Sequence, residues 1–294
     1  MHPRVCLHQV TFINETTEAF IGHCRAIGVQ HMDLVTPKLF QPDELAQAHR
    51  ALAGESEVKI DRMLAATGLF KEPAQSPAGP APRCHVVNHP LAMGSTLDQV
   101  GEEETEGLLR AIDIAAELGA PNIYLVSGGR GALLWEAAAE RFAELIAPCL
   151  GPAQEKGVAL LVETASHLNA DMHFAHTLDD TIRLAEIAQI GVCIELAGCW
   201  FEGNLREKFR RALPNTGLVQ ISDYVPGDRS TPNRAVPGDG MVPCEWLLRE
   251  LLEAGYKGVF DLELVGPRID AEGCYAASKR AAENLSELLT KLGA

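Results

Sequence analysis

The sequence predicts an α/β protein with the (β/α)8 TIM-barrel architecture. Short apolar runs rich in Val and Ile alternate along the chain with stretches of helical periodicity, as they do in successive βα units. Eight such units fit into the 294 residues, a length typical of one barrel, so we expect a single domain over residues 1–294. A doubly wound open sheet is the alternative, but no GxGxxG fingerprint follows the first predicted strand.

The first half of the chain supplies four βα units. Three of its strands are predicted at residues 5–10, 31–35 and 122–126. Its helices are predicted at residues 17–27, 43–52, 102–118 and 134–155. Gly28 and Gly119 follow two of these helices, at the position where glycine commonly ends a helix.

The strand of the third unit has two candidates. Residues 58–65 and 84–88 both have strand-like patterns, and residues 72–82 between them are rich in Pro and Gly. We favour 58–65 as the barrel strand and keep 84–88 as the alternative.

In the second half of the chain, predicted strands and helices alternate more clearly. Strands are predicted at residues 158–163, 191–195, 217–222 and 258–264. Helices are predicted at residues 178–188, 205–213, 243–253 and 275–292. Pro243 suits a first helical position and Gly255 a helix stop.

Composition excludes several classes of function. With 25 Lys and Arg against 40 Asp and Glu, the formal net charge is −15, which repels nucleic acid and anionic membranes. No run of 18 apolar residues and no signal-peptide core is present, so we expect a cytoplasmic protein without a membrane segment. The eight cysteines form no CxxC pair and are expected to be reduced packing residues, with Cys199 the one candidate for lining a site.

Chemistry in a barrel of this type lies at the carboxyl ends of the strands. The last four predicted strands carry a carboxylate or an amide there: Glu163, Glu195, Gln220 and Glu263. One such acid alone is more often a helix cap or a solvated group. Three Glu and one Gln would converge on the barrel axis, where the unpaired carboxylates would repel one another and be costly to desolvate, and a cation would resolve that conflict. Because all the ligands offer oxygen, Mn²⁺ or Mg²⁺ is favoured over Zn²⁺.

Three segments carry a resemblance to a known family. They are VQISDY at 219–224, RAVPGDG at 234–240 and GYKGVFDLE at 255–263. Their order resembles the seventh and eighth strands of the xylose isomerase-like barrels in the sugar phosphate isomerase/epimerase group. That group includes ketose 3-epimerases, hydroxypyruvate isomerase, inosose dehydratase and the apurinic endonuclease IV. The resemblance is strongest over residues 158–270.

The resemblance implies that Glu163, Glu195, Gln220 and Glu263 are the metal ligands. The chain departs from the family pattern at two of them, because Glu195 replaces the usual Asp and Gln220 the usual His. It also has Gly198 where many members have a further His. A Gln carbonyl can ligate a hard cation, so we expect binding with reduced affinity.

The resemblance also implies substrate contacts. His167, four residues after Glu163, is similar to the family's loop histidine, and Arg234 to its substrate-contacting arginine, whose planar fork suits oxygen-rich ligands. Trp200 could provide an apolar wall and His8 could reach the pocket floor. The alternatives without a functional role are that His167 is an ordinary loop histidine, that Arg234 is a solvated loop charge and that Trp200 is buried under the adjacent loop.

The leading hypothesis is a divalent-metal-dependent isomerase or epimerase of a sugar or polyol-derived keto compound. The resemblance implies that Glu163 and Glu263 act as the acid/base pair that moves a proton next to the carbonyl. Cys199, Trp200 and the residue at Gly198 motivate a second hypothesis, a dehydratase or other lyase. The two ligand departures motivate a third, a non-catalytic barrel with a degenerate metal site. An endonuclease is the least favoured hypothesis, because the metal cluster of endonuclease IV needs several histidine ligands.

The expected partner is a small-molecule substrate. Its identity lies in the loops, which carry no shared code, so the sequence leaves it open. The oligomeric state is open too, and a homo-oligomer is compatible with the sequence because barrels often pair through loops and helices.

Overall fold

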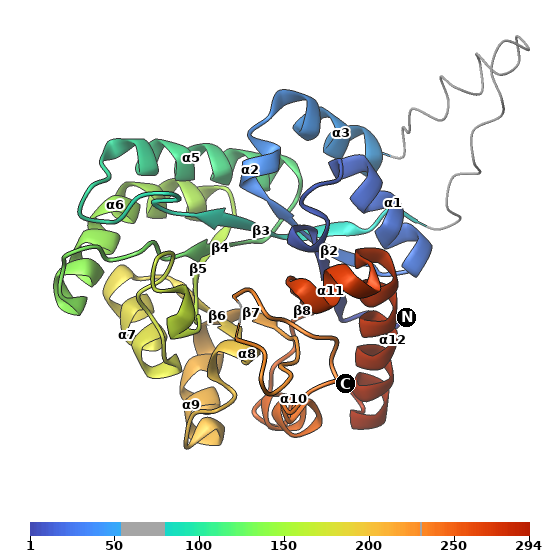
Figure 1. Ribbon diagram of the computed structural model, residues 1–294. Coiled ribbons are helices and arrows are strands. Elements are labelled where there is room, and N and C mark those ends of the chain that lie inside the picture. The colour runs from blue at the N-terminus through green and yellow to red at the C-terminus, as the bar shows by residue number, and fades with distance from the viewer. Residues whose placement is uncertain (54–79, 230) are drawn as a thin grey trace, which may run out of the picture.

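The computed structural model describes residues 1–53, 80–229 and 231–294, and its strands form a closed parallel barrel in sequence order (Figure 1). Helices surround the barrel, so the predicted (β/α)8 TIM barrel is confirmed. The strands are β1 (Val5–His8), β2 (His31–Val35), β3 (Arg83–Pro90), β4 (Asn122–Val126), β5 (Ala159–Glu163), β6 (Gly191–Glu195), β7 (Thr216–Gln220) and β8 (Phe260–Leu262).

Each predicted helix is present with nearly the predicted bounds, and the structure adds the short helices α2 (Thr36–Leu39), α8 (Leu196–Cys199) and α11 (Pro267–Glu272), which were not predicted. The helices that were predicted are α1 (Thr17–Ile27), α3 (Pro42–Leu52), α5 (Glu102–Glu117), α6 (Trp135–Glu155), α7 (Leu178–Ala188), α9 (Leu205–Ala212), α10 (Cys244–Glu253) and α12 (Cys274–Leu292). Short 3₁₀ turns add η1 (Gln9–Phe12), η2 (His167–Asn169) and η3 (Leu213–Asn215). Among the described helices, none has the length and apolar character that crossing a membrane requires.

The favoured third strand was wrong. The barrel strand between β2 and β4 is β3, which contains the alternative segment 84–88, while residues 58–65 lie outside the described residues. A barrel strand is covered on both faces, and β3 buries Cys84, Val86, Val87 and His89. The sequence VKIDRMLA at 58–65 would instead bring three charged side chains into that position.

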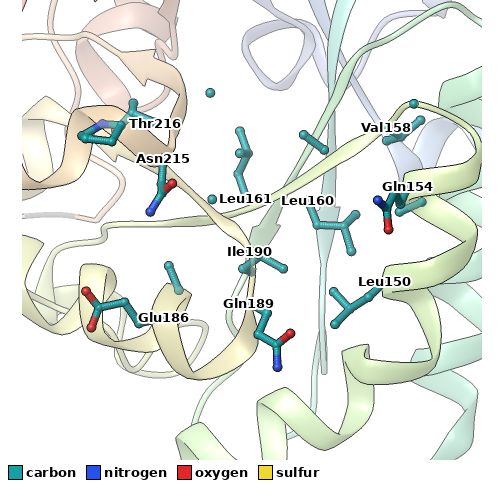
Figure 2. Close-up of a pocket in the computed structure, with 17 residues that line it drawn as sticks. Leu150, Gln154, Val158, Leu160, Leu161, Glu186, Gln189, Ile190, Asn215 and Thr216 are labelled. Atoms are coloured by element: carbon teal, nitrogen blue, oxygen red, sulfur yellow. The ribbon is translucent and has the colours of Figure 1, made fainter.

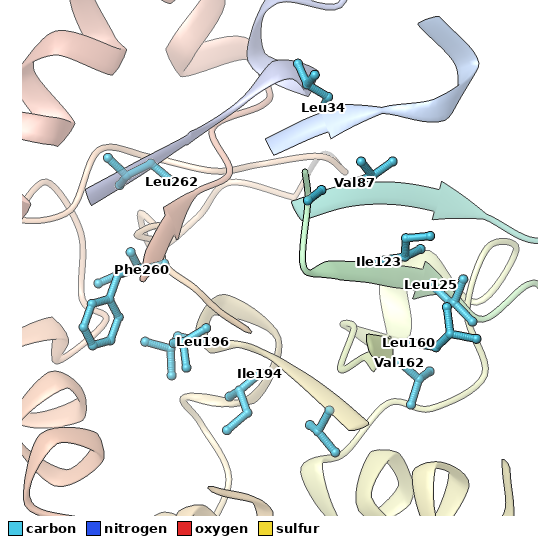
Figure 3. Packing of buried hydrophobic residues seen from close by; sticks show 14 of the residues in the cluster. Leu34, Val87, Ile123, Leu125, Leu160, Val162, Ile194, Leu196, Phe260 and Leu262 are labelled. Carbon is cyan, nitrogen blue, oxygen red and sulfur yellow. The ribbon is translucent and has the colours of Figure 1, made fainter. Parts of the chain in front are cut away.

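Side chains alternate between the two faces of each strand. The outward set packs against the helices and forms most of the hydrophobic core, as Figure 3 shows for Leu34, Ile123, Val162 and Ile194. A smaller inward set fills the barrel and consists of Cys6, Val86, Tyr124, Leu161, Cys193, Leu218 and Val259. All eight cysteines are unpaired and seven are buried, as expected of reduced packing residues.

The same alternation sets which polar side chains enter the barrel. Two residues beyond inward Leu161, Cys193 and Leu218 come Glu163, Glu195 and Gln220, which therefore point inward. On the last strand, Val259 is inward, so Asp261 and Glu263 follow on the same face. The strand register places Glu195 beside Gln220 and Gln220 beside Asp261.

Candidate functional site

A cavity of about 330 Å³ opens at the carboxyl end of the strands. Its walls come from strands β1, β3, β4 and β5 and from the loops after β3, β5, β7 and β8. The polar side chains that line it include His8, Tyr124, Glu163, His173, Arg234 and Glu263. It therefore lies where barrel enzymes carry their chemistry.

Arg234 provides a positive charge among the strand-end carboxylates. Its Nη2 lies 3.1 Å from Glu195 Oε2 and 3.6 Å from Glu263 Oε2, and its side chain is only 11% exposed. The arginine Nε is buried without a hydrogen-bond partner among the described residues. Burial alone would lower the pKa of Arg234, but Glu195, Glu263 and Glu163 raise it above its ordinary value.

The loop that holds Arg234 is built around Asp223. The Asp223 carboxylate accepts backbone N–H bonds from Tyr224, Gly238, Gly240 and Val242 at 2.7–3.0 Å. A Cβ at Gly240 would lie 2.1 Å from the Tyr224 carbonyl oxygen, so only glycine fits there. These contacts explain in structural terms why the SDY and PGDG segments carry an aspartate and glycines at these positions.

The same loop is tied to the segment after β8 and to helix α12. The backbone N–H of Arg234 donates to the Val265 carbonyl at 2.9 Å, and Ala235 pairs with Asp223 in an antiparallel bridge. Asp239 accepts a bidentate pair from Arg280 of α12 at 2.7 Å. Arg234 is thus presented to the site by a fixed loop.

The buried carboxyls of Glu163 and Glu195, near Arg234, lie in surroundings that disfavour their ionised forms. Burial, together with the nearby charges of Glu263 and Glu195, raises the pKa of Glu163 well above its ordinary value. Burial raises the pKa of Glu195 to about 7, against the opposing effect of Arg234. Glu195 also caps α8, because its Oε1 accepts the Ala197 N–H at 2.9 Å.

Gln220 lies below the cavity. Cys193 Sγ donates to Gln220 Oε1 at 3.3 Å, and Gln220 Nε2 donates to Asp261 Oδ2 at 3.5 Å. Gln220 and Glu195 are fully buried and do not line the cavity, whereas Glu163 and Glu263 do. The four predicted ligands therefore divide into two that face the cavity and two that lie beneath it.

The carboxylates fit a hard divalent cation by their chemistry. Glu195 Oε2 is buried and has no well-directed hydrogen bond from the described residues, although Arg234 Nη2 is 3.1 Å away. Burial is the main cause of the raised pKa values of Glu163 and Glu195, and a cation beside them would favour their ionised forms. Three carboxylates that converge on Arg234 are a donor set of the kind that Mg²⁺ and Mn²⁺ prefer.

A second acidic group lies deeper in the barrel. Ligand atoms of His8, Asp33 and Asp261 all lie within 4.8 Å of one another, and all three side chains are buried. Within the part of the chain that the structure describes, both carboxylate oxygens of Asp33 and Oδ1 of Asp261 lack a well-directed hydrogen bond. Burial and the charge of Asp261 raise the pKa of Asp33 well above its ordinary value.

The tautomer of His8 decides what this deeper group can do. His8 Nδ1 accepts the Val10 N–H at 2.9 Å, so the proton of a neutral ring is on Nε2. Nε2 lies 2.6 Å from the Tyr124 hydroxyl and 3.2 Å from Asp33 Oδ2. A protonated Nε2 has no lone pair for a metal, so His8 is a hydrogen-bond donor in this group.

Two of the four predicted substrate-binding residues line the cavity and two do not. Arg234 and His8 line the cavity, whereas His167 and Trp200 do not, and His167 is exposed on η2. Trp200 packs against Phe201 and Tyr224. The candidate Cys199 is fully buried and likewise does not line the cavity.

Sequence reasoning missed His173, Asp33, Asp261 and Tyr124. His173 lines the cavity with its Nε2 3.8 Å from Glu163 Oε2, and burial lowers its pKa to about 3. Asp261 precedes Glu263 by two residues, so strand alternation alone would have found it. His173 lies ten residues beyond β5 in an irregular loop, where the sequence carries no such signal.

A larger concavity, about 840 Å³, lies at the opposite end of the barrel (Figure 2). Its walls are mainly apolar or amide side chains, such as Leu150, Ile190, Gln154 and Gln189. It lies at the amino ends of β5, β6 and β7, far from the carboxylates, so we do not assign the chemistry to it.

The glycine-rich loop after β4 packs against other loops. A Cβ at Gly129 would lie 2.4 Å from the Asp171 carbonyl oxygen, and one at Gly131 would lie 2.0 Å from the Asp98 carboxylate. These glycines therefore allow close contact between loops at the cavity rim.

Comparisons with solved structures show the same fold at low identity. The IolI protein with a bound zinc atom shares 15% identity at a TM-score of 0.73, over 98% of this chain and 99% of that one. The D-psicose 3-epimerase from Clostridium cellulolyticum H10, solved with D-tagatose, shares 13% at 0.71, over 97% and 98%. A xylose isomerase-like TIM barrel protein from Mycobacterium smegmatis, in complex with magnesium, shares 16% at 0.65, over 99% and 98%.

The family model described as xylose isomerase-like TIM barrel matches residues 21–291. No curated protein matches the chain by sequence. The family model spans almost all of the barrel, from α1 to the last turns of α12. The chain therefore belongs to the xylose isomerase-like TIM barrel family.

Proposed function

We propose that the chain is a divalent-metal-dependent isomerase or epimerase of a sugar- or polyol-derived keto compound. The observation that carries this proposal is the arrangement of Glu163 and Glu263, which open into one cavity beside Arg234. Two carboxylates and a cationic group around one small cavity suit proton transfer at carbon next to a carbonyl.

Glu163, Glu195 and Glu263 would hold the cation, with the Gln220 amide beneath them. When bound, a divalent cation polarises a carbonyl oxygen and makes the neighbouring C–H bond more acidic. The buried Nε–H of Arg234 has no acceptor among the described residues, so it can donate to a substrate oxygen. The arginine thereby orients the substrate and supports negative charge on that oxygen.

The two cavity carboxyls differ in their surroundings. Glu163 is the more enclosed of the two, with a side chain that is 6% exposed against 16% for Glu263. Glu263 pairs with Arg234 at 3.6 Å and is less buried. We therefore assign proton removal to Glu263 and proton return to Glu163, which gives epimerisation or isomerisation according to the carbon that receives the proton.

The structural neighbours support the reaction class and the need for a metal. One of them is an epimerase of a keto sugar, and others were solved with zinc or magnesium. Their different metals leave the choice among Mn²⁺, Mg²⁺ and Zn²⁺ to experiment.

The proposal is tested by solvent exchange. Small hydroxyketones are incubated with the protein and Mg²⁺ or Mn²⁺ in D₂O, and ¹H NMR follows deuterium entering the carbon next to the carbonyl. We expect Glu263→Gln to slow exchange by about 10³-fold, within the usual range for loss of a general base. Glu287→Gln, on an exposed position of α12, is the matched control and retains the wild-type rate.

Mass spectrometry of the products separates the lyase alternative, because isomerisation conserves mass and dehydration loses water. Exchange at the wild-type rate in Glu263→Gln would overturn the proposal.

A further inference from the structure

The cavity has two chemical zones. Its floor carries the charged and hydrogen-bonding groups described above, whereas its mouth carries uncovered apolar side chains. Met93 is 60% exposed, Leu168 is 49% exposed and Met172 is 41% exposed, and all three line the cavity. They are among the most exposed large apolar side chains of the described residues, and they gather at one opening from the loops after β3 and β5.

Several polar side chains at the mouth bond to the protein, and the exposed Asp171 also lines the cavity there. Thr231 Oγ1 donates to Asn169 Oδ1 at 2.6 Å and so joins the loops after β7 and β5. Ser166 Oγ accepts the Leu168 N–H at 3.3 Å, and Asn233 Nδ2 donates to the Asp228 carbonyl at 3.4 Å. These contacts occupy part of the polar surface at the mouth, whereas the apolar side chains of Met93, Leu168 and Met172 remain exposed there.

Burial energetics favour an apolar occupant. Covering exposed apolar surface removes it from water and so stabilises a complex. Hydroxyl groups placed against the same surface would lose water without gaining hydrogen bonds, which is unfavourable. The volume of about 330 Å³ is at the small end of the range of ligand sites, so it suits a compact molecule.

We infer that the substrate is a small hydroxyketone whose far end is apolar, such as a deoxygenated alkyl chain or an aromatic ring. Its adjacent carbonyl and hydroxyl oxygens lie at the Glu163, Arg234 and Glu263 floor. Its apolar substituent lies against Met93, Leu168 and Met172 at the mouth. This inference rests on the proposed function, because the hydroxyketone head is the group on which that chemistry acts.

Three probes with the same HO–CH₂–C(=O)– head test the inference. Erythrulose carries two further hydroxyls, 1-hydroxybutan-2-one has the same four carbons without them, and 2-hydroxyacetophenone carries a phenyl ring. Isothermal titration of the Mg²⁺-supplemented protein measures the Kd of each. We expect the phenyl compound to bind at least tenfold more tightly than erythrulose, with 1-hydroxybutan-2-one between them.

The double substitution Leu168→Ser with Met172→Ser should reduce this ratio to within about threefold, because it removes apolar surface from the mouth. Both side chains are exposed on a loop, so the fold tolerates the change. Met241→Ser is the matched control, since Met241 is 50% exposed but does not line the cavity. It should keep the wild-type ratio.

Tighter binding of erythrulose overturns the inference, as does a failure of all three probes to bind. A preserved ratio in the double variant also overturns it. Failure of the proposed function looks different: the apolar probes bind with the expected preference, yet no deuterium enters any of them.

Discussion

Two groups of carboxyls lie at the same end of this barrel, and their surroundings differ. Glu163, Glu195 and Glu263 converge on Arg234, and two of them face the cavity. Asp33 and Asp261 lie deeper, fully buried with His8, and do not line the cavity. Both groups lie on or directly after barrel strands, so access to the cavity and a cationic partner are what distinguish the carboxylates to which we assign a chemical role.

The deeper group has a structural role in this account. His8 caps η1 through Nδ1 and contacts Tyr124 and Asp33 through Nε2, so its ring links three strands. Raised pKa values of Asp33 and Asp261, caused first by burial, favour their protonated forms. Neutral carboxyls that share hydrogen bonds can remain in the barrel interior without a metal.

The largest expected effect contrasts the two groups through activity. Glu263→Gln lowers the solvent-exchange rate by about 10³-fold, whereas Asp33→Asn should lower it by less than about tenfold, because Asp33 does not face the substrate. Both rates come from the same NMR measurement in D₂O. Equal losses in the two variants would remove the distinction between the groups.

Next in size is the effect of Arg234 on stability. Arg234→Gln leaves the Glu195 carboxyl buried without its cationic partner, so we expect a loss of about 3 kcal/mol of unfolding free energy at pH 8. Urea denaturation measures it, and Mg²⁺ should restore part of the loss. Arg280→Gln, whose ion pairs are exposed, is the control and should cost less than about 1 kcal/mol. Equal costs would contradict the role assigned to Arg234.

A smaller expected effect is the pH dependence of stability that comes from a buried histidine outside the cavity. His89 is buried with Thr36 Oγ1 2.9 Å from its Nδ1, and burial lowers its pKa to about 4. Below about pH 6.5 the unfolded chain takes up a proton that folded His89 does not, so stability falls by about 1.4 kcal/mol per pH unit.

In His89→Gln this contribution is absent, so the stability difference from the wild type shrinks between pH 7 and pH 5. Denaturation at the two pH values measures it, with exposed His167→Gln as the control. A difference that grows as the pH falls would contradict the sign.

Most of the fold was predictable because each βα unit is a local pattern. Strands such as His31–Val35 and Gly191–Glu195 have the predicted bounds, as does the helix Leu178–Ala188. The third strand was misplaced, because two segments with strand-like patterns competed and only the neighbours β2 and β4 select between them.

The site was predictable where it follows strand alternation. Glu163, Glu195, Gln220 and Glu263 reach the barrel interior or its mouth because of that period. His173 and the exposure of His167 depend on the path of an irregular loop, which no local pattern encodes.

The most direct test is a Mn²⁺ titration of three proteins by calorimetry: the wild type, Glu263→Gln and Asp33→Asn. We expect one ion per wild-type chain, at least tenfold weaker binding in Glu263→Gln, and nearly wild-type binding in Asp33→Asn. Binding that survives in Glu263→Gln but is lost in Asp33→Asn would place the ion at His8, Asp33 and Asp261 and contradict a metal site at Glu163, Glu195 and Glu263.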